Sequence, residues 1–156
     1  MEPAGVGADG GYAAAVPVRH RVVLLSFVLW TAFVWANRIS NTLRSETESA
    51  GAKTFSTVLS VVLLLLALAV VIVMVRAWKA AVSPGGGKVL MVAAAFTVVV
   101  WLVRVPQILI ADHTVAFKVV HVALGVVSVV LALLVWQIGA RAVRGGDRSA
   151  MESSRA

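Results

Sequence analysis

The chain has 156 residues, of which 60% are hydrophobic and only 13% are charged, and its net charge is +7. Soluble domains carry about a quarter charged residues, so this composition predicts an integral membrane protein. The sequence has no cysteine, which excludes disulfides, thiolate metal sites and cysteine nucleophiles. The basic residues gather at the ends of apolar runs, where they set topology and contact head groups, so the net charge does not indicate nucleic-acid binding.

Four apolar runs reach membrane length, after an N-terminal tail at 1–18 that we predict to be disordered. Each run must form a helix, because backbone groups in lipid have no other hydrogen-bond partners. The predicted helices are residues 22–43, 55–75, 89–110 and 119–140. The helices pair into two hairpins, at residues 19–80 and 88–144. A Pro/Gly linker at 81–87, which breaks helices, joins the hairpins, and a cytoplasmic tail follows at 145–156. The predicted fold class is an all-α membrane protein with four transmembrane helices, built as two tandem parallel-repeat hairpins.

The second hairpin repeats the first. Residues 23–43 align with residues 89–109, and tryptophan and arginine, which are scarce in membrane segments, recur at the same positions. These matches are Trp35 with Trp101 and Arg38 with Arg104. When one loop residue is deleted, basic residues also coincide at the ends of the second helices, at Lys53/Lys118, Arg76/Arg141 and Lys79/Arg144. We therefore predict a duplicated hairpin whose copies have the same orientation.

Small residues in the second helix of each hairpin predict how the hairpins meet. Ser60, Ala67, Gly125 and Ala132 let helix backbones approach closely. We expect the hairpins to pack on each other about a pseudo-twofold axis along the membrane normal.

The basic residues near helix ends predict that both termini are cytoplasmic. In that orientation the inner side carries Arg19, Arg21, Arg76, Lys79, Lys88, Arg141, Arg144, Arg148 and Arg155. The outer side carries Arg38, Arg44, Lys53, Arg104 and Lys118, partly neutralised by Glu46, Glu48 and Asp112. Cytoplasmic segments carry the excess of Lys and Arg, which favours this orientation.

Arginines near the outer ends of the first and third helices are the best candidates for a binding site. Arg104 shares a helix face with Trp101 and lies one turn from the amide of Gln107. If the fourth helix is antiparallel to the third, it brings the imidazole of His121 near Arg104. The predicted lipid or partner patch consists of Trp101, Arg104, Gln107 and His121, with a weaker twin made of Trp35, Arg38 and Asn41. The competing interpretation is that both arginines extend to the outer head groups and simply end the helices.

No catalytic or cofactor chemistry is readable from the sequence, so we expect the protein not to be an enzyme and to have no cofactor. Asp112, His113 and His121 invite a metal interpretation, but one carboxylate and two imidazoles at this spacing are weak support for it. Neither a Ser-His-Asp arrangement nor a nucleotide-binding fingerprint is recognisable. Pro106-Gln107 matches the dipeptide of PQ-loop transporters, and the match ends there.

The second hairpin carries a loose motif over residues 101–144. It consists of Phe117-Lys-Val-Val-His121 followed by Leu124, Ser128, Leu131, Gly139, Arg141 and Arg144. With these residues the chain resembles small uncharacterised actinobacterial membrane proteins built from two-helix hairpins. The resemblance implies a bacterial plasma-membrane protein and implies no activity.

Two functions remain open from the sequence. The first is a small structural or accessory membrane protein that contacts lipids, an anionic lipid included, or another membrane protein. The second is an oligomeric subunit of a small-solute transporter or channel, in which the chain would assemble as a homo-oligomer. A polar face through the bilayer would separate them, and the second and fourth helices have no polar residue in their middle thirds apart from Ser128. This pattern favours the accessory protein.

Overall fold

The computed structural model describes residues 17–46 and 49–155, and these form four helices and their connections. The helices are α1 (Val18–Arg44), α2 (Ala50–Arg76), α3 (Pro84–Ile110) and α4 (Val115–Ser153). All four are long and apolar enough to cross a membrane. The predicted all-helical fold with four membrane-length helices is therefore confirmed. The predicted disordered tail, up to residue 16, lies outside the described residues.

Serine and threonine side chains start three of the helices. Ser49, Ser83 and Thr114 each accept a hydrogen bond from the backbone N–H three residues later, at 3.3, 3.1 and 3.4 Å. Such caps satisfy donors that have no partner inside the helix. The cap at Ser83 corrects the predicted helix-breaking linker at 81–87, of which only 81–83 are non-helical. Pro84 occupies the first turn of α3, where proline costs no hydrogen bond, and residues 85–87 are already helical.

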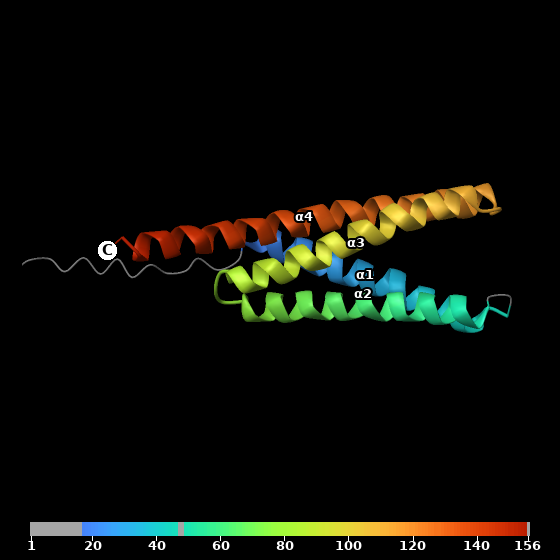
Figure 1. Cartoon of the computed structure of the whole chain (residues 1–156), viewed down its shortest axis with the longest axis horizontal. Helices are drawn as coiled ribbons and strands as arrows, with labels where there is room; N and C mark the ends of the chain where they lie inside the picture. The colour runs from blue at the N-terminus through green and yellow to red at the C-terminus, as the bar shows by residue number, and fades with distance from the viewer. Residues whose placement is uncertain (1–16, 47–48, 156) are drawn as a thin grey trace, which may run out of the picture.

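α4 is also longer than the sequence pattern indicates. Its 39 residues span about 58 Å at 1.5 Å per residue, well beyond a hydrocarbon core of about 30 Å. The predicted C-terminal tail is therefore helical as far as Ser153, and Figure 1 shows it continuing α4 beyond the other helices. α3 likewise continues through Pro106 to Ile110.

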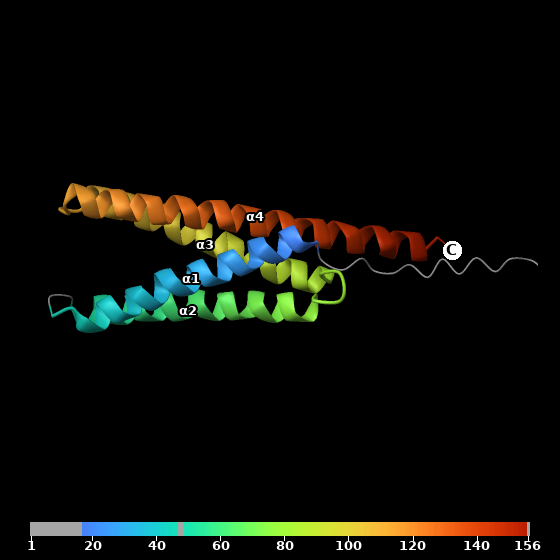
Figure 2. The same ribbon diagram turned by 180° about the vertical axis from the view of Figure 1, so that it is seen from behind.

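The helices form two antiparallel hairpins, α1–α2 and α3–α4, and α3 with α4 makes the most extensive interface. The hairpins meet through α1 against α4 and α2 against α3. Figure 1 and Figure 2 show them closest where α2 passes into α3, and farther apart toward the two hairpin tips.

The convergent end holds the main hydrophobic core. Its buried side chains come from all four helices and include Leu24, Phe27, Val70, Leu90 and Val135. Polar contacts close the same end: an Arg21 Nη donates to the Trp78 carbonyl at 2.8 Å, and the guanidinium lies 4.7 Å from the Trp78 ring centroid. Buried apolar packing therefore joins the two hairpins at this end, and these polar contacts join α1 to the residues that follow α2.

Glycines allow α3 and α4 to approach closely at this end. A Cβ at Gly87 would lie 2.7 Å from the Gly139 carbonyl oxygen, and a Cβ at Gly139 would lie 2.6 Å from the Gly87 oxygen. Gly125 serves a similar purpose, because a Cβ there would lie 2.9 Å from Cε3 of Trp101. Gly125 thus faces α3 of its own hairpin, and the expectation that it faces the other hairpin is wrong.

The same positions are buried in both copies of the repeat. Along α1 and α3, at a spacing of 66, the buried pairs are Leu24/Leu90, Phe27/Ala93, Thr31/Thr97, Trp35/Trp101 and Thr42/Ile108. Along α2 and α4, at a spacing of 65, they are Ser60/Gly125, Leu63/Ser128, Ala67/Ala132, Val70/Val135 and Val73/Ile138. The interfaces correspond too, because exchanging the hairpins converts the α1–α4 contact into the α3–α2 contact. The described hairpins thus occupy equivalent places.

Candidate functional site

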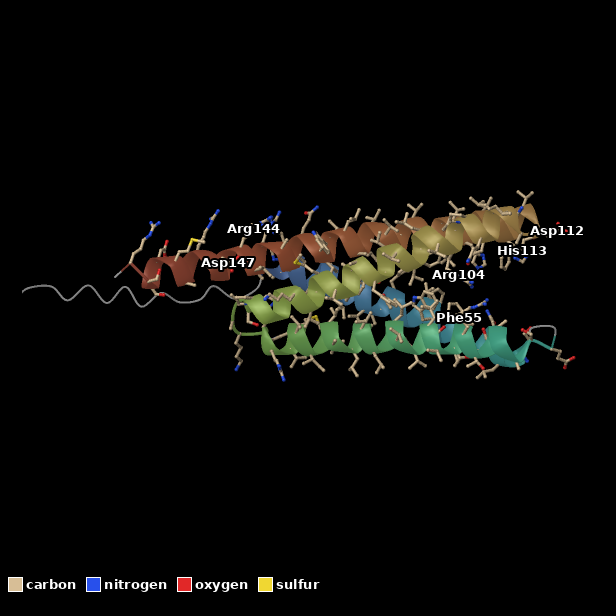
Figure 3. The ribbon with its side chains drawn as sticks, in the orientation of Figure 1. Phe55, Arg104, Asp112, His113, Arg144 and Asp147 are labelled. Carbon is tan, nitrogen blue, oxygen red and sulfur yellow. The ribbon has the colours of Figure 1, made fainter. Side chains whose placement is uncertain are left out.

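A cavity of about 440 Å³ lies between the hairpins at their divergent end, within the size range of small-ligand sites. The predicted patch contributes Trp35, Arg38, Asn41, Trp101, Arg104 and His121 to its lining. Figure 3 shows Arg104 on the side of the α3–α4 hairpin that faces the other hairpin. The cavity therefore joins the predicted patch and its twin into one site.

Gln107, the remaining predicted residue, does not line the cavity and is exposed. At 3.6 residues per turn, it lies about 120° around α3 from Trp101, whereas Arg104 lies about 60° away. Gln107 lies at the predicted height along α3, but the structure places it on a different face of the helix from the cavity. Its inclusion in a patch that faces the bundle is therefore wrong.

The two tryptophans that occupy equivalent places in the repeat meet at the cavity. The ring centroids of Trp35 and Trp101 lie 6.3 Å apart at 56° between planes, a tilted geometry that aromatic pairs favour. Trp35 is 6% exposed and Trp101 is 5% exposed. Leu63 and Val100 pack with Trp35 in a second hydrophobic cluster. The indole pair separates the cavity from the apolar core at the convergent end.

Trp101 carries a buried donor whose hydrogen-bonding capacity is unused. Its Nε1 has no hydrogen-bond partner among the described residues. The ring edge with Cε3 and Cζ3 faces Gly125 of α4, so the opposite edge, which carries Nε1, points away from Gly125. A buried donor without a partner costs about 1–3 kcal/mol. By contrast, Nε1 of Trp30 donates to Ser128 Oγ at 2.9 Å.

On the α1 side, Arg38 belongs to a network that the sequence analysis missed. Its Nε donates to Ser56 Oγ of α2 at 2.8 Å, and Ser56 Oγ lies 3.2 Å from Thr42 Oγ1. Ser60 donates in turn to the Ser56 carbonyl at 2.7 Å. The signal was in the repeat, because a spacing of 65 pairs Ser56 with His121. The residues beside the two arginines therefore occupy equivalent places and differ in chemistry.

His121 is fixed by contacts within the first turns of α4. Its Nδ1 lies 2.8 Å from the Phe117 carbonyl oxygen, and its ring centroid lies 3.9 Å from that of Phe117. On the other side, the Phe117 ring lies 4.5 Å from His113. A phenyl ring thus lies against both imidazoles.

The metal interpretation gains no support from this end of the hairpin. Figure 3 shows Asp112 and His113 at its tip, beyond Arg104. Among the described residues no group of three His, Asp or Glu side chains is placed to hold a metal ion.

The lining combines positive charge with apolar walls. Two guanidiniums contribute to it, and none of the described lining residues is Asp or Glu. The walls are formed by Phe33, Val34, Ile108, Phe117, Val120 and Leu124. Such a cavity suits a molecule with an anionic group and an apolar portion, because guanidinium binds carboxylate or phosphate with two parallel hydrogen bonds.

The chain is, by its fold, a four-helix bundle of two hairpins with the lengths and composition of a multi-pass membrane protein. No family model matches it, and neither a curated protein nor a solved structure is similar to it.

Proposed function

We propose that the protein is a non-catalytic accessory protein of the bacterial plasma membrane, which binds a lipid or a partner protein in the cavity between its hairpins. The observation that carries this proposal is convergence: Trp35 and Arg38 from α1, Trp101 and Arg104 from α3, and His121 from α4 line one cavity. An arginine at mid-membrane costs about 2.5–3.5 kcal/mol on insertion scales, and less near the interface. Two such residues kept at equivalent depths support a binding role.

The depth of the site supports a ligand from the membrane interface. Arg38 and Arg104 each lie six residues before the end of their helix, at Arg44 and Ile110, which is about 9 Å of helix length. Both guanidiniums therefore lie near the head-group region when the helices span a bilayer.

The packing favours an accessory protein over the alternative of a transporter or channel subunit. The polar lining ends at the Trp35–Trp101 pair, and the bundle beyond it is filled by the apolar core around Phe27, Leu90 and Val135. A solute path through one chain would have to cross that core. A homo-oligomeric pore would need a polar outer face instead, whereas the exposed face of α2 carries Val58, Leu65 and Leu68.

The topology we propose places both termini in the cytoplasm and the cavity in the outer leaflet. Its support is the excess of nine Lys and Arg residues over five between the two ends of the bundle. The convergent end, with the Arg21–Trp78 contact, would then lie at the cytoplasmic interface. The assignment to a bacterial plasma membrane rests on the resemblance of residues 101–144.

The experiment compares what remains bound to the intact chain after gentle purification. Wild-type protein is extracted from native membranes in mild detergent and analysed by native mass spectrometry beside Arg104→Leu and Arg44→Leu. Arg44 is an exposed arginine at the end of α1 that does not line the cavity, so it serves as the matched control. We expect Arg104→Leu to lose a bound species that Arg44→Leu retains. Equal spectra for all three proteins would overturn the proposal.

A further inference from the structure

Trp101, which lines the cavity, carries a buried Nε1–H that lacks a hydrogen-bond acceptor among the described residues. Its side chain is 5% exposed. A native fold rarely keeps a buried donor in this condition without a role for it. A ligand oxygen beside the indole would supply the missing acceptor. Because Nε1 is closed off from water, the indole would have to turn toward the cavity for a ligand oxygen to reach it.

The two copies of the repeat have diverged where they meet this cavity. In the first copy, Ser56 and Thr42 form a hydrogen-bonded network with Arg38 that fixes its guanidinium against α2. In the second copy, the equivalent positions are His121 and Ile108, so that serine–threonine pair is absent. The first copy therefore positions its arginine through neighbouring helices. The second copy brings Arg104 and an imidazole to the cavity lining.

The flanks of the cavity add an apolar requirement. Phe33 of α1 is 59% exposed and Phe117 of α4 is 38% exposed, and both line the cavity. They lie on opposite hairpins and leave apolar surface on either side of the polar groups. A free anion would use none of this surface, whereas an acyl chain would cover it.

We propose that the cavity binds the phosphate group of an anionic phospholipid, with the guanidinium of Arg104 and the Trp101 Nε1–H as its main donors and Arg38 as a positioning residue. A phosphate fits because it offers several acceptor oxygens, enough for a bidentate guanidinium and one indole donor. The acyl chains lie along the flanks at Phe33 and Phe117. This inference rests on the proposed function and names the ligand class for the same cavity.

The test uses the full chain in lipid-free detergent and three added lipids. Phosphatidylglycerol carries an anionic phosphate, phosphatidylcholine neutralises its phosphate with a cation, and diacylglycerol has no phosphate. Inorganic phosphate forms a fourth arm, which separates a lipid ligand from a free anion. We expect phosphatidylglycerol to bind about tenfold more tightly than diacylglycerol, as one or two charge-assisted hydrogen bonds would give. Phosphatidylcholine, which keeps the phosphate oxygens and lacks the net charge, should bind with intermediate affinity. Comparable binding of inorganic phosphate alone would overturn the assignment to a lipid.

Trp101→Phe is the decisive variant, because it removes the N–H and keeps an aromatic ring. It should weaken phosphatidylglycerol binding roughly tenfold, as the loss of one charge-assisted hydrogen bond would. Trp136→Phe, at a tryptophan of α4 that does not line the cavity, is the control and should bind phosphatidylglycerol as wild type does. Unchanged lipid binding by Trp101→Phe, or an equal loss in both variants, would refute the role given to Nε1.

The outcome also separates this inference from the proposed function. If Arg104→Leu loses a co-purifying protein and no variant changes lipid binding, the accessory role stands and the phospholipid assignment fails. If Arg104→Leu loses nothing and phosphatidylglycerol shows no preference, both fail.

Discussion

The contact between Gly87 and Gly139 gives the sharpest test of how α3 and α4 pack. In Gly87→Ala the new Cβ would lie 2.7 Å from the Gly139 carbonyl oxygen, with further contacts of 3.1 Å to Ala142 Cβ and Val143 Cγ2. Ordinary contact begins at 3.4 Å, so the two backbones must separate by about 0.7 Å (3.4 minus 2.7). A gap of this size forfeits about a quarter to a half of the dispersion energy across it. We expect an overpacking cost of about 1–3 kcal/mol.

Gly145→Ala provides the matched control for this prediction. Gly145 is also helical, in α4, and a Cβ there meets nothing within 4 Å. Alanine gains up to about 1 kcal/mol of helix propensity over glycine at either position, so comparing the two variants removes most of that gain. The free energy of unfolding, measured by SDS titration in mixed micelles, should be about 1–3 kcal/mol lower for Gly87→Ala than for Gly145→Ala. A difference below about 0.5 kcal/mol would refute the close approach of the backbones.

Three further predictions use other parts of the structure. Ser128→Ala removes the acceptor of Trp30 Nε1 and should lower the free energy of unfolding by about 0.6 kcal/mol, up to about 1.7, in the same titration; no change would contradict the α1–α4 hydrogen bond. Ser83→Ala removes a helix cap and should destabilise by about 1 kcal/mol, whereas Ser149→Ala, an exposed serine outside any cap, should change little. For topology, single cysteines at Gly51 and Gly85, where a Cβ meets nothing within 4 Å, should differ in labelling of intact cells by an impermeant maleimide. Labelling at Gly51 alone is expected, and labelling at Gly85 alone would reverse the proposed orientation.

The four helices could be predicted from the sequence because each one depends only on the residues of its own apolar run. A run of some twenty apolar residues must be helical in lipid, whatever its neighbours, so existence and order could be read from composition. The helix ends were harder to predict. Ser83-Pro84-Gly85 was interpreted as a break, yet the same residues form a cap followed by a proline at the first helical position. The helical continuation of α4 through Gly145 and Gly146 could not be read from glycines that usually end helices.

Six of the seven predicted patch residues line the cavity, and for the two tryptophans and the two arginines the repeat fixed depth and face together. Trp35 and Trp101 identified the buried face, and the arginines three residues later share it. The partners on neighbouring helices could not be predicted in this way. Ser56 has no feature that distinguishes it from other serines in its helix until Arg38 is placed against it at 2.8 Å. From the sequence, Phe33 and Phe117 are ordinary lipid-facing residues. Their place in one cavity lining depends on how the two hairpins are arranged.

A duplicated hairpin would also account for a binding site in so small a bundle, if the proposed function holds. Two identical hairpins related by a twofold axis would place identical residues at the axis, and a symmetric pair of arginines would repel each other there unless each had its own partner. The first copy solves this locally, because Ser56 and Thr42 hold Arg38 against α2. The second copy replaces that pair by His121 and Ile108, and it places Arg104 and the buried Nε1–H of Trp101 in the shared cavity lining. The two hairpins share the buried positions that pack them together and differ in the polar ones, so that under the proposed function the first copy would stabilise the site and the second would provide its donors.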